Sequence, residues 1–357
     1  MQKICFVVPT LERGGMERVV SLLANYAVSQ RLKVYVIFLI RDDVAYDLLS
    51  EVVVVAPKIK YKKSLAGKVR ALIYLREELK NIKPAAVLSF SEVFNPLAIV
   101  AGRLAGTPIY ISDRSSPLKK LRLGVEVLRK LLYPMSSGMI AQTEQSKKVS
   151  LFKKYNKNIT VIPNPLLNFK QSSVPGDQSN DENIVITVGR LVPSKNTKGL
   201  IDIFYEVEGS ELWQLWILGD GSERCMLEKY IYELGVESRV KIFGAVSDVE
   251  YYLSRAKIFC FTSLSEGFPN ALSEALGFPL PCVAYDCPAG PADLIKDGEN
   301  GYLVPLHDKQ EFKERLCSLM HDASLRASLM ESYEQHRAKY ELNLIASKYL
   351  RFILPES

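Results

Sequence analysis

This chain of 357 residues lacks long apolar runs. The run ALGFPLPCVAY, at 275–285, is far shorter than the ~18 residues that a membrane-spanning helix needs. The apolar start MQKICFVVPT is also short and leads to Glu12 and a Gly-Gly pair, which predicts a buried first strand rather than a signal peptide. The six cysteines have no metal-type spacing, since even Cys282 and Cys287 are five positions apart. These absences favour a cytoplasmic protein with reduced core thiols.

Two nucleotide-binding fingerprints are missing as well. Neither half of the chain opens with GxGxxG, which disfavours an NAD-dependent oxidoreductase, and no GxxxxGK(S/T) sequence marks a P-loop. The turn GDGSER, at 219–224, follows an apolar run but lacks the lysine of a P-loop. Mononucleotide hydrolysis is therefore unsupported.

Charge is distributed unevenly along the chain. Residues 1–165 contain 27 Lys and Arg but only 12 Asp and Glu, whereas the remainder is acidic. The basic residues concentrate in clusters at 58–70, 118–132 and 147–157. In 118–132, leucine and valine recur at helical spacing between Lys and Arg, which is typical of an amphipathic segment that lies on anionic lipid. The alternatives are a core-packing helix with a basic rim and ordinary solvated helix faces.

Short apolar runs alternate with helical periodicity over the whole chain. Strands are expected at 4–8, 34–40, 85–90, 109–112, 139–142 and 159–163, and then at 184–189, 212–219, 240–244, 258–263 and 282–286. This alternation predicts an α/β fold with two Rossmann-like, doubly wound domains that face a cleft. The expected domains are 1–165 and 184–339, joined by a polar linker at 166–183. A C-terminal helix at about 340–357 is free to pack back onto the first domain.

Ligands of such folds bind outside the carboxyl ends of the strands, so the loops there are the candidate sites. Gly14 and Gly15 open a helix after the first strand and would let an anion approach backbone N–H groups, although a plain turn is the alternative. Arg190 and Lys195 follow the strand at 184–189 and could clamp a diphosphate. An unoccupied basic loop is the alternative there.

The segment SEGFPNALSEALG, at 265–277, offers both hydrogen-bond donors and acceptors. Glu266 lies just past the strand at 258–263, and a helix that starts near Asn270 carries Glu274. Free backbone N–H groups at the helix start favour phosphate, whereas the carboxylates favour sugar hydroxyls. This combination predicts a nucleotide-sugar site. Between the two glutamates it is expected to include Gly267, Phe268, Pro269, Asn270 and Ala271.

At this point the residues resemble a known family. Glu266 and Glu274 with GFPNALS between them resemble the signature of the family-4 retaining glycosyltransferases, which have two Rossmann-like domains, the GT-B fold. GRLVPSKN resembles the diphosphate clamp of that family, RGGMER its N-terminal glycine-rich loop, and DGENGYLVP its segment after the donor site. The resemblance covers essentially the whole chain. CPAGPADLI looks most like bacterial surface-polysaccharide and lipid-linked oligosaccharide transferases that use UDP-sugars.

The resemblance implies roles for the donor-site residues. Glu274 would bind the ribose, Glu266 the hexose hydroxyls, and Arg190 with Lys195 the departing UDP. The backbone of Gly244, Ala245 and Val246 would contact the uracil. Such enzymes require no divalent metal or other cofactor, because fixed cations stabilise the leaving group. In agreement, the sequence has no DxD motif, and His307, His321 and His336 fall outside the motifs.

The acceptor loop departs from the usual pattern. Many relatives carry His or Asp after the strand at 109–112, and here the loop reads SDRSSP. Asp113 could orient the acceptor or support positive charge on the sugar, and Arg114 could touch a phosphate. The alternative is a local Asp–Arg pair. The expected catalytic residues are thus Glu266, Arg190, Lys195 and Asp113, without a protein nucleophile.

The expected function is retaining, metal-independent transfer of a hexose or N-acetylhexosamine from a UDP-sugar to a lipid-diphosphate-linked glycan. Such transfer would serve cell-surface polysaccharides such as lipopolysaccharide, O-antigen or capsule, at the inner face of the cytoplasmic membrane. The basic first domain would contact the anionic membrane surface, and nucleic acid is not an expected partner. A UDP-sugar 2-epimerase of the same fold and a non-catalytic, membrane-associated binding protein remain alternatives.

Overall fold

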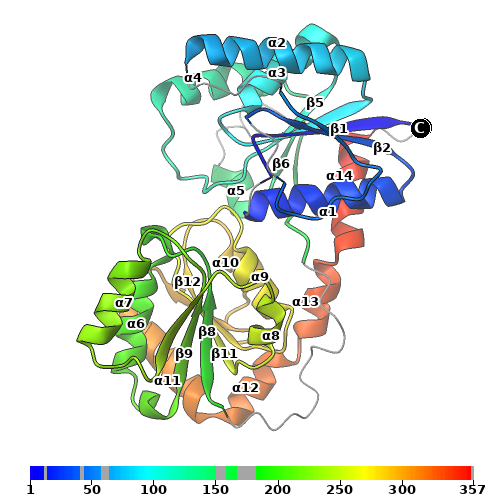
Figure 1. Cartoon of the computed structure of the whole chain (residues 1–357). Helices are drawn as coiled ribbons and strands as arrows, with labels where there is room; N and C mark the ends of the chain where they lie inside the picture. Colours follow the sequence, from blue (N-terminus) through cyan, green and yellow to red (C-terminus); the bar gives the residue numbers. More distant parts are fainter. Residues whose placement is uncertain (12–13, 41–43, 58–63, 150–157, 167–181, 355–357) are drawn as a thin grey trace. The chain divides into compact units, whose positions relative to one another are not determined.

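The computed structural model describes residues 1–11, 14–40, 44–57, 64–149, 158–166 and 182–354 (Figure 1). The chain divides into two compact units. Unit 1 comprises Met1–Pro165 and Leu342–Ser357, and unit 2 comprises Leu166–Glu341. Each unit contains one parallel β-sheet, so the expected α/β class with two doubly wound domains is confirmed. Most of the linker expected at 166–183 lies outside the described residues.

The sheet of unit 1 has the strand order β3-β2-β1-β4-β5-β6-β7. Its strands are β1 (Lys3–Val8), β2 (Lys33–Phe38), β3 (Val53–Val55), β4 (Ala86–Phe90), β5 (Ile109–Ser112), β6 (Gly138–Ala141) and β7 (Ile159–Val161). The central strands β1 and β4 are buried along nearly their whole length, as in-register parallel strands covered on both faces should be.

Helices cover both faces of this sheet, as Figure 1 shows within unit 1. The helix α1 (Gly15–Ser29) packs with α14 (Leu342–Ile353) on one face, where Phe6 and Tyr349 are part of the core. The other face carries α2 (Leu65–Ile82), α3 (Asn95–Ala105) and α4 (Leu123–Leu132), followed by the short helix η1 (Tyr133–Met135). The helix α5 (Glu144–Val149) follows β6.

The sheet of unit 2 has the order β10-β9-β8-β11-β12-β13. Its strands are β8 (Ile184–Val188), β9 (Gln214–Leu218), β10 (Val240–Gly244), β11 (Ile258–Phe261), β12 (Cys282–Asp286) and β13 (Tyr302–Pro305). Its helices are η4 (Pro193–Lys195), α6 (Thr197–Glu206), η5 (Ser210–Leu212), α7 (Arg224–Glu233), α8 (Val249–Leu253), α9 (Asn270–Leu276), α10 (Pro291–Leu294), α11 (Lys309–His321), α12 (Ala323–Met330) and α13 (Tyr333–Lys339). Strands β8 and β11 are neighbours although two other strands, β9 and β10, separate them in the chain, so the loops after them meet at one edge.

Two strands were not expected from the sequence. Both β3 and β13 are edge strands of only three and four residues. Residues Val53 and Val54 of β3 are exposed, so an apolar run there gives no inside–outside alternation to read. In β13 the alternation is real, with Tyr302 and Val304 buried, but it spans too few residues to stand out.

The amphipathic segment expected at 118–132 is helical only from Leu123 onward. Pro117 and a turn precede the helix, and Arg122 at its N-terminus supplies no side-chain cap. The helix α4 buries none of its residues, and Leu123 and Leu131 are 81% and 64% exposed. Across the described part of the chain, no helix combines the length and apolar character that a membrane span requires.

Candidate active site

Lys195 and Glu266 form an ion pair at the carboxyl edge of the unit 2 sheet. The Lys195 Nζ and a Glu266 carboxylate oxygen lie 2.5 Å apart, and both side chains are largely buried. The ammonium also lies 5.5 Å from the centre of the Phe261 ring, a favourable cation–π distance. The two residues follow the neighbouring strands β8 and β11, which explains why positions 71 apart in sequence meet.

Hydrogen bonds fix the loops that carry this pair. The backbone N–H of Leu264 donates to the Ser194 carbonyl at 2.8 Å. The Thr262 hydroxyl donates to the carbonyls of Lys195 and Asn196 at 3.3 and 3.2 Å. Cation and carboxylate are thus held by a rigid frame rather than by flexible loops, as a preorganised charged site requires.

Arg190 lies in the same loop as Lys195 but differs from it in exposure. It is the first residue after Gly189, it is exposed, and its side chain has no partner among the described residues. Its guanidinium therefore remains available for a ligand. Two cations of one loop, one paired and one open, are compatible with the diphosphate clamp that the sequence predicts.

The helix α9 carries the rest of the signature segment. Glu274 is 5% exposed within this helix, and Phe268 is buried just before it. The backbone N–H of Asn270, expected to be free, instead donates to the Phe268 carbonyl at 3.0 Å, because the turn closes on itself there. The Pro-Ala-Gly-Pro loop supports the turn: Gly290 has φ +135°, and a Cβ there would come within 2.2 Å of the Pro269 ring.

The helix α13 supports α9 from behind, which the sequence did not reveal. His336 is buried, its Nε2 lies 3.4 Å from the Ser273 hydroxyl, and burial lowers its pKa to about 4. Tyr340 stacks on His336 at 4.6 Å and lies 6.4 Å from the Phe268 ring. The histidine therefore contacts the helix next to Glu274 as a neutral packing group, although it lies far from the motif in sequence.

The expected uracil contacts lie at the end of the edge strand β10. Gly244 has φ +75°, a conformation that favours glycine, and Ala245 is exposed. The Gly244 carbonyl accepts a hydrogen bond from the Gly219 N–H at 2.8 Å, which joins this loop to the end of β9. Val246 packs into the core below, so the backbone of this turn is fixed.

The glycine pair of unit 1 is tied to a tyrosine. The Gly14 N–H donates to the Tyr46 hydroxyl at 3.0 Å, and that hydroxyl donates to the Gly14 carbonyl at 2.9 Å. Gly14 has extended backbone at the start of α1, and Gly15 is its first residue. One of the N–H groups expected to face an anion thus has an internal partner, and residues 12–13 of the same loop lie outside the described residues.

Asp113 is the centre of a polar network after β5. One carboxylate oxygen accepts from the Tyr133 hydroxyl at 2.7 Å and from the Asn95 amide at 3.0 Å. The other accepts from the Arg129 guanidinium at 2.5 Å. Burial raises the pKa of Asp113 to about 6, against the opposing effect of the Arg129 charge.

Glu92, in the loop after β4, holds the loop that follows Asp113. One of its oxygens accepts from the backbone N–H groups of Arg114 and Ser115, at 3.0 and 2.5 Å, and from the Ser115 hydroxyl. Burial tends to raise its pKa, but these hydrogen bonds outweigh burial and lower it. Glu92 closely follows the strand expected at 85–90. The principle that ligands bind at the carboxyl ends of strands could therefore have identified it from the sequence.

Arg114 points away from Asp113, into unit 1. Its guanidinium donates to Asn164 at 2.6 Å and to the Tyr349 hydroxyl at 3.2 Å, and it lies 4.6 Å from the centre of the Phe90 ring. The alternative of a local Asp113–Arg114 pair is not what forms, since Arg129 takes that place. This placement favours a structural role for Arg114 over the predicted contact with an acceptor phosphate.

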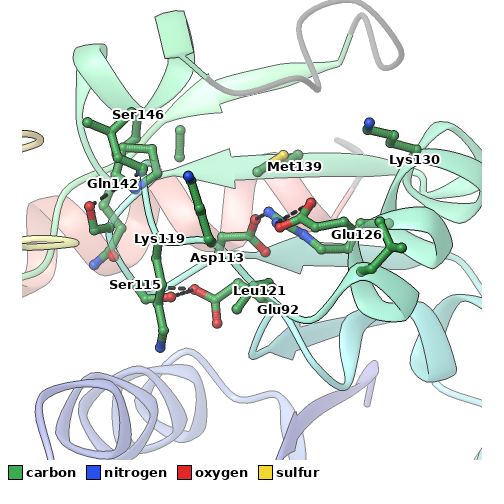
Figure 2. Close-up of a pocket in the computed structure, with 17 residues that line it drawn as sticks. Glu92, Asp113, Ser115, Lys119, Leu121, Glu126, Lys130, Met139, Gln142 and Ser146 are labelled. Atoms are coloured by element: carbon green, nitrogen blue, oxygen red, sulfur yellow. Dashed lines mark hydrogen bonds and ion pairs between the residues drawn. The ribbon is translucent and has the colours of Figure 1, made fainter.

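A cavity of about 470 Å³ lies beside Asp113 in unit 1 (Figure 2). Its polar lining includes Glu92, Asp113 and Gln142, which follow β4, β5 and β6, and Ser146 of α5. The segment 115–130 contributes leucines and lysines together with Glu126 and Arg129. This volume suits a small-molecule ligand, and the carboxylates favour hydroxyl groups over phosphate.

Sequence reasoning missed several residues of this network, among them Asn95, Arg129, Tyr133 and Gln142. Arg129 belongs to the basic segment 118–132, whose pattern predicts a membrane-facing surface. Asn95 and Tyr133 carry no local signal, because only the fold brings α3 and η1 to the end of β5. Among the described residues, no group of three or more His, Cys, Asp or Glu is arranged to hold a metal ion.

Comparison with known proteins assigns the fold and the family. The model of Glycosyltransferase Family 4 matches residues 13–166, and that of Glycosyl transferases group 1 matches residues 169–336. An α-1,4-N-acetyl-D-galactosaminyltransferase of Campylobacter jejuni, named for an undecaprenol-diphosphate-linked glycan acceptor, is 28% identical over 99% of this chain and 98% of its own. A lipopolysaccharide 1,6-galactosyltransferase of Salmonella typhimurium is 37% identical over 41% of this chain and 42% of its own.

Solved structures agree on the architecture. The lipopolysaccharide outer core galactosyltransferase WaaB, in its apo form, aligns with a TM-score of 0.78 and 24% identity over 98% of this chain and 99% of its own. The Anabaena protein Alr3699/HepE, solved with UDP, aligns with a TM-score of 0.81 and 18% identity over 98% and 99%. The two family matches follow one another along nearly the entire chain, so the protein belongs to the GT-B glycosyltransferases of the family-4 type, whose relatives here act in bacterial surface-polysaccharide synthesis.

Proposed function

We propose that this chain transfers a hexose or N-acetylhexosamine from a UDP-sugar to a lipid-diphosphate-linked glycan, with retention of configuration and without a divalent metal. The Lys195–Glu266 ion pair carries this proposal. It places a cation suited to a leaving diphosphate beside a carboxylate suited to hexose hydroxyls. When a donor binds, Lys195 turns to the phosphate and Glu266 becomes free to accept from the sugar.

The remaining donor contacts follow from the signature segment. Arg190, exposed in the loop of Lys195, adds a second cation for the diphosphate. Glu274 binds the ribose, and the turn at Gly244–Val246 contacts the uracil. The fold neighbour solved with UDP supports a uridine nucleotide as the ligand of this architecture. Fixed cations replace a metal at the leaving group.

The acceptor binds on unit 1 in the cavity beside Asp113. The acceptor hydroxyl donates to the Asp113 carboxylate, which orients its oxygen toward the anomeric carbon. The bond from that carbon to the β-phosphate oxygen breaks, and the acceptor oxygen bonds to the same face. In this step the hydroxyl proton leaves its hydrogen bond with Asp113 and passes to the departing phosphate. The C. jejuni relative, named for a glycan on undecaprenol diphosphate, supports an acceptor of this class.

The membrane surface holds this acceptor, and unit 1 presents a suitable face to it. Exposed leucines and a valine of α4 lie beside the exposed Lys130 of the same helix. Just before the helix, Lys119, Lys120 and Arg122 are exposed as well. The first turns of α2 add Leu65, Val69 and Ile73, spaced four residues apart and also exposed. Apolar rows flanked by lysines fit an anionic lipid surface at the cytoplasmic face of the membrane. Of the other basic clusters, 58–63 and 150–157 lie outside the described residues.

Release of UDP tests the proposal directly. The purified chain is incubated with a panel of UDP-sugars and extracted lipid-linked glycans in the presence of EDTA, with and without the lipid. We expect release that depends on both donor and lipid and that survives EDTA. Interconversion of a UDP-sugar without lipid would instead identify an epimerase, and UDP binding without turnover a binding protein.

A further inference from the structure

The carboxylate of Asp113 receives its partners from three separate elements. Asn95 of α3, Tyr133 of η1 and Arg129 of α4 all converge on it. Figure 2 shows Asp113 at the cavity wall, with Glu92 and Glu126 nearby. Such convergence fixes the position of this carboxylate.

Arg129 reaches Asp113 from a helix that is otherwise weakly anchored. The helix α4 buries none of its residues, whereas the Arg129 side chain is only 12% exposed. Its guanidinium also contacts Glu126 at 3.0 Å and lies 5.2 Å from the centre of the Tyr133 ring. A buried ion pair contributes little net stability compared with apolar packing. Its place on this helix therefore indicates a role toward Asp113 rather than toward the fold.

Glu92 acts on Asp113 from the opposite side. It binds the backbone of the two residues that follow Asp113, so it fixes the direction in which the aspartate leaves β5. Its negative charge also faces the same cavity. Because its hydrogen bonds keep it ionised, this charge persists while Asp113 titrates.

We propose that Arg129 and Glu92 are positioning residues that act on Asp113 with opposite charge, so that its carboxylate is aimed into the cavity and ready to accept from the acceptor hydroxyl. The inference rests on the proposed function of Asp113 as the acceptor-orienting group. Neither positioning residue needs to touch the substrate. Arg129 also connects the exposed face of α4 to the reacting end of the acceptor.

The two residues shift the titration of Asp113 in opposite directions. The Arg129 charge lowers the pKa of Asp113, and the Glu92 charge raises it. The other titratable and charged groups that face this carboxylate or line the cavity are Tyr133, Glu126, Lys119, Lys120 and Lys130. If the ionised form binds the acceptor, activity falls on the acid side as Asp113 protonates. Removal of Arg129 should move this fall to higher pH, and removal of the Glu92 charge to lower pH.

The test compares pH profiles of kcat/KM for the acceptor at saturating donor, from about pH 5 to about pH 8. We expect Arg129→Gln to move the acid limb up by about one pH unit and Glu92→Gln to move it down by about half a unit. Arg129→Lys keeps the positive charge, so the acid limb of its pH profile should stay close to that of the unmodified protein. Arg76→Gln and Glu77→Gln, which remove the two members of an exposed ion pair on α2, are the matched controls.

The proposal would be overturned if the acid limb of the pH profile stayed in place in Arg129→Gln and Glu92→Gln, or moved in the same direction in both. If Arg129→Gln does not fold, as judged by circular dichroism, Glu92→Gln and Arg129→Lys still decide the question. Carbon NMR titration of labelled aspartate, with Asp113→Asn to assign the signal, measures the same shifts without turnover. A chain without lipid-dependent UDP release would refute the proposed function, and the NMR shifts would then decide the positioning roles alone.

Discussion

The two units hold their charged site residues in different ways. In unit 2, Lys195 and Glu266 pair with each other, and Arg190 in the same loop is exposed. In unit 1, the arginines near the site already bind internal partners. Arg129 binds Asp113, and Arg114 binds Asn164 and Tyr349. Cations that can change partner suit a diphosphate that arrives and leaves, whereas committed cations suit a carboxylate that must stay oriented. Under the proposed function, the cations of unit 2 would serve the donor diphosphate, and those of unit 1 would hold the carboxylate that orients the acceptor hydroxyl.

The largest effect should come from the exchangeable pair. We expect Lys195→Ala to lower kcat by about a thousandfold, because it removes charge stabilisation at the leaving group. Lys198→Ala, which removes an exposed lysine of α6 paired with Asp202, is the matched control and should remain near full activity. The measurement is steady-state UDP release with the lipid-linked acceptor. If Lys195→Ala retained more than about a tenth of the activity, the assignment of phosphate to unit 2 would be wrong.

The proximity of Lys195 and Glu266 can be predicted from the sequence for a physical reason. Lys195 and Glu266 each follow a strand directly, and the carboxyl ends of neighbouring parallel strands meet at one edge. Strand-end position alone therefore brings the two together. The contacts that support the signature segment could not be predicted from the sequence. The Gly290 contact with Pro269 and the packing of His336 on α9 depend on the fold.

The site around Asp113 is harder to predict from the sequence, because the hydrogen-bond partners of Asp113 lie on helices. Asp113 and Glu92 closely follow strands, so their proximity can be predicted in the same way as that of Lys195 and Glu266. Arg129, in contrast, lies inside the helix α4. A basic residue on an amphipathic helix gives the same sequence signal whether it faces lipid or turns inward. Arg114 shows the converse, since its strand-end position suggested a ligand contact but its guanidinium packs against Phe90.

The structural role of Arg114 can be tested by measuring the stability of the folded protein. We expect Arg114→Met to lower the free energy of unfolding by about 2 kcal/mol, because it leaves Asn164 and Tyr349 without their cation. Urea unfolding measures this loss, with Arg103→Met on the exposed side of α3 as the control. The KM for the lipid acceptor should change little in the folded fraction. A large rise in KM with unchanged stability would return Arg114 to the acceptor phosphate and break the contrast between the units.

The smallest effect concerns the exposed face of α4. Leu123 and Leu131 are 81% and 64% exposed, and we expect the double change to serine to weaken binding to anionic vesicles by roughly tenfold. Leu212→Ser in unit 2, at a leucine that is 73% exposed, is the matched control and should leave binding unchanged. Co-sedimentation with vesicles at low and high salt separates the apolar from the charged contribution, since only the latter is screened. Equal losses for both units would mean that exposed leucines adhere to lipid wherever they lie, and α4 would then be an ordinary helix whose one specific task is to deliver Arg129 to Asp113.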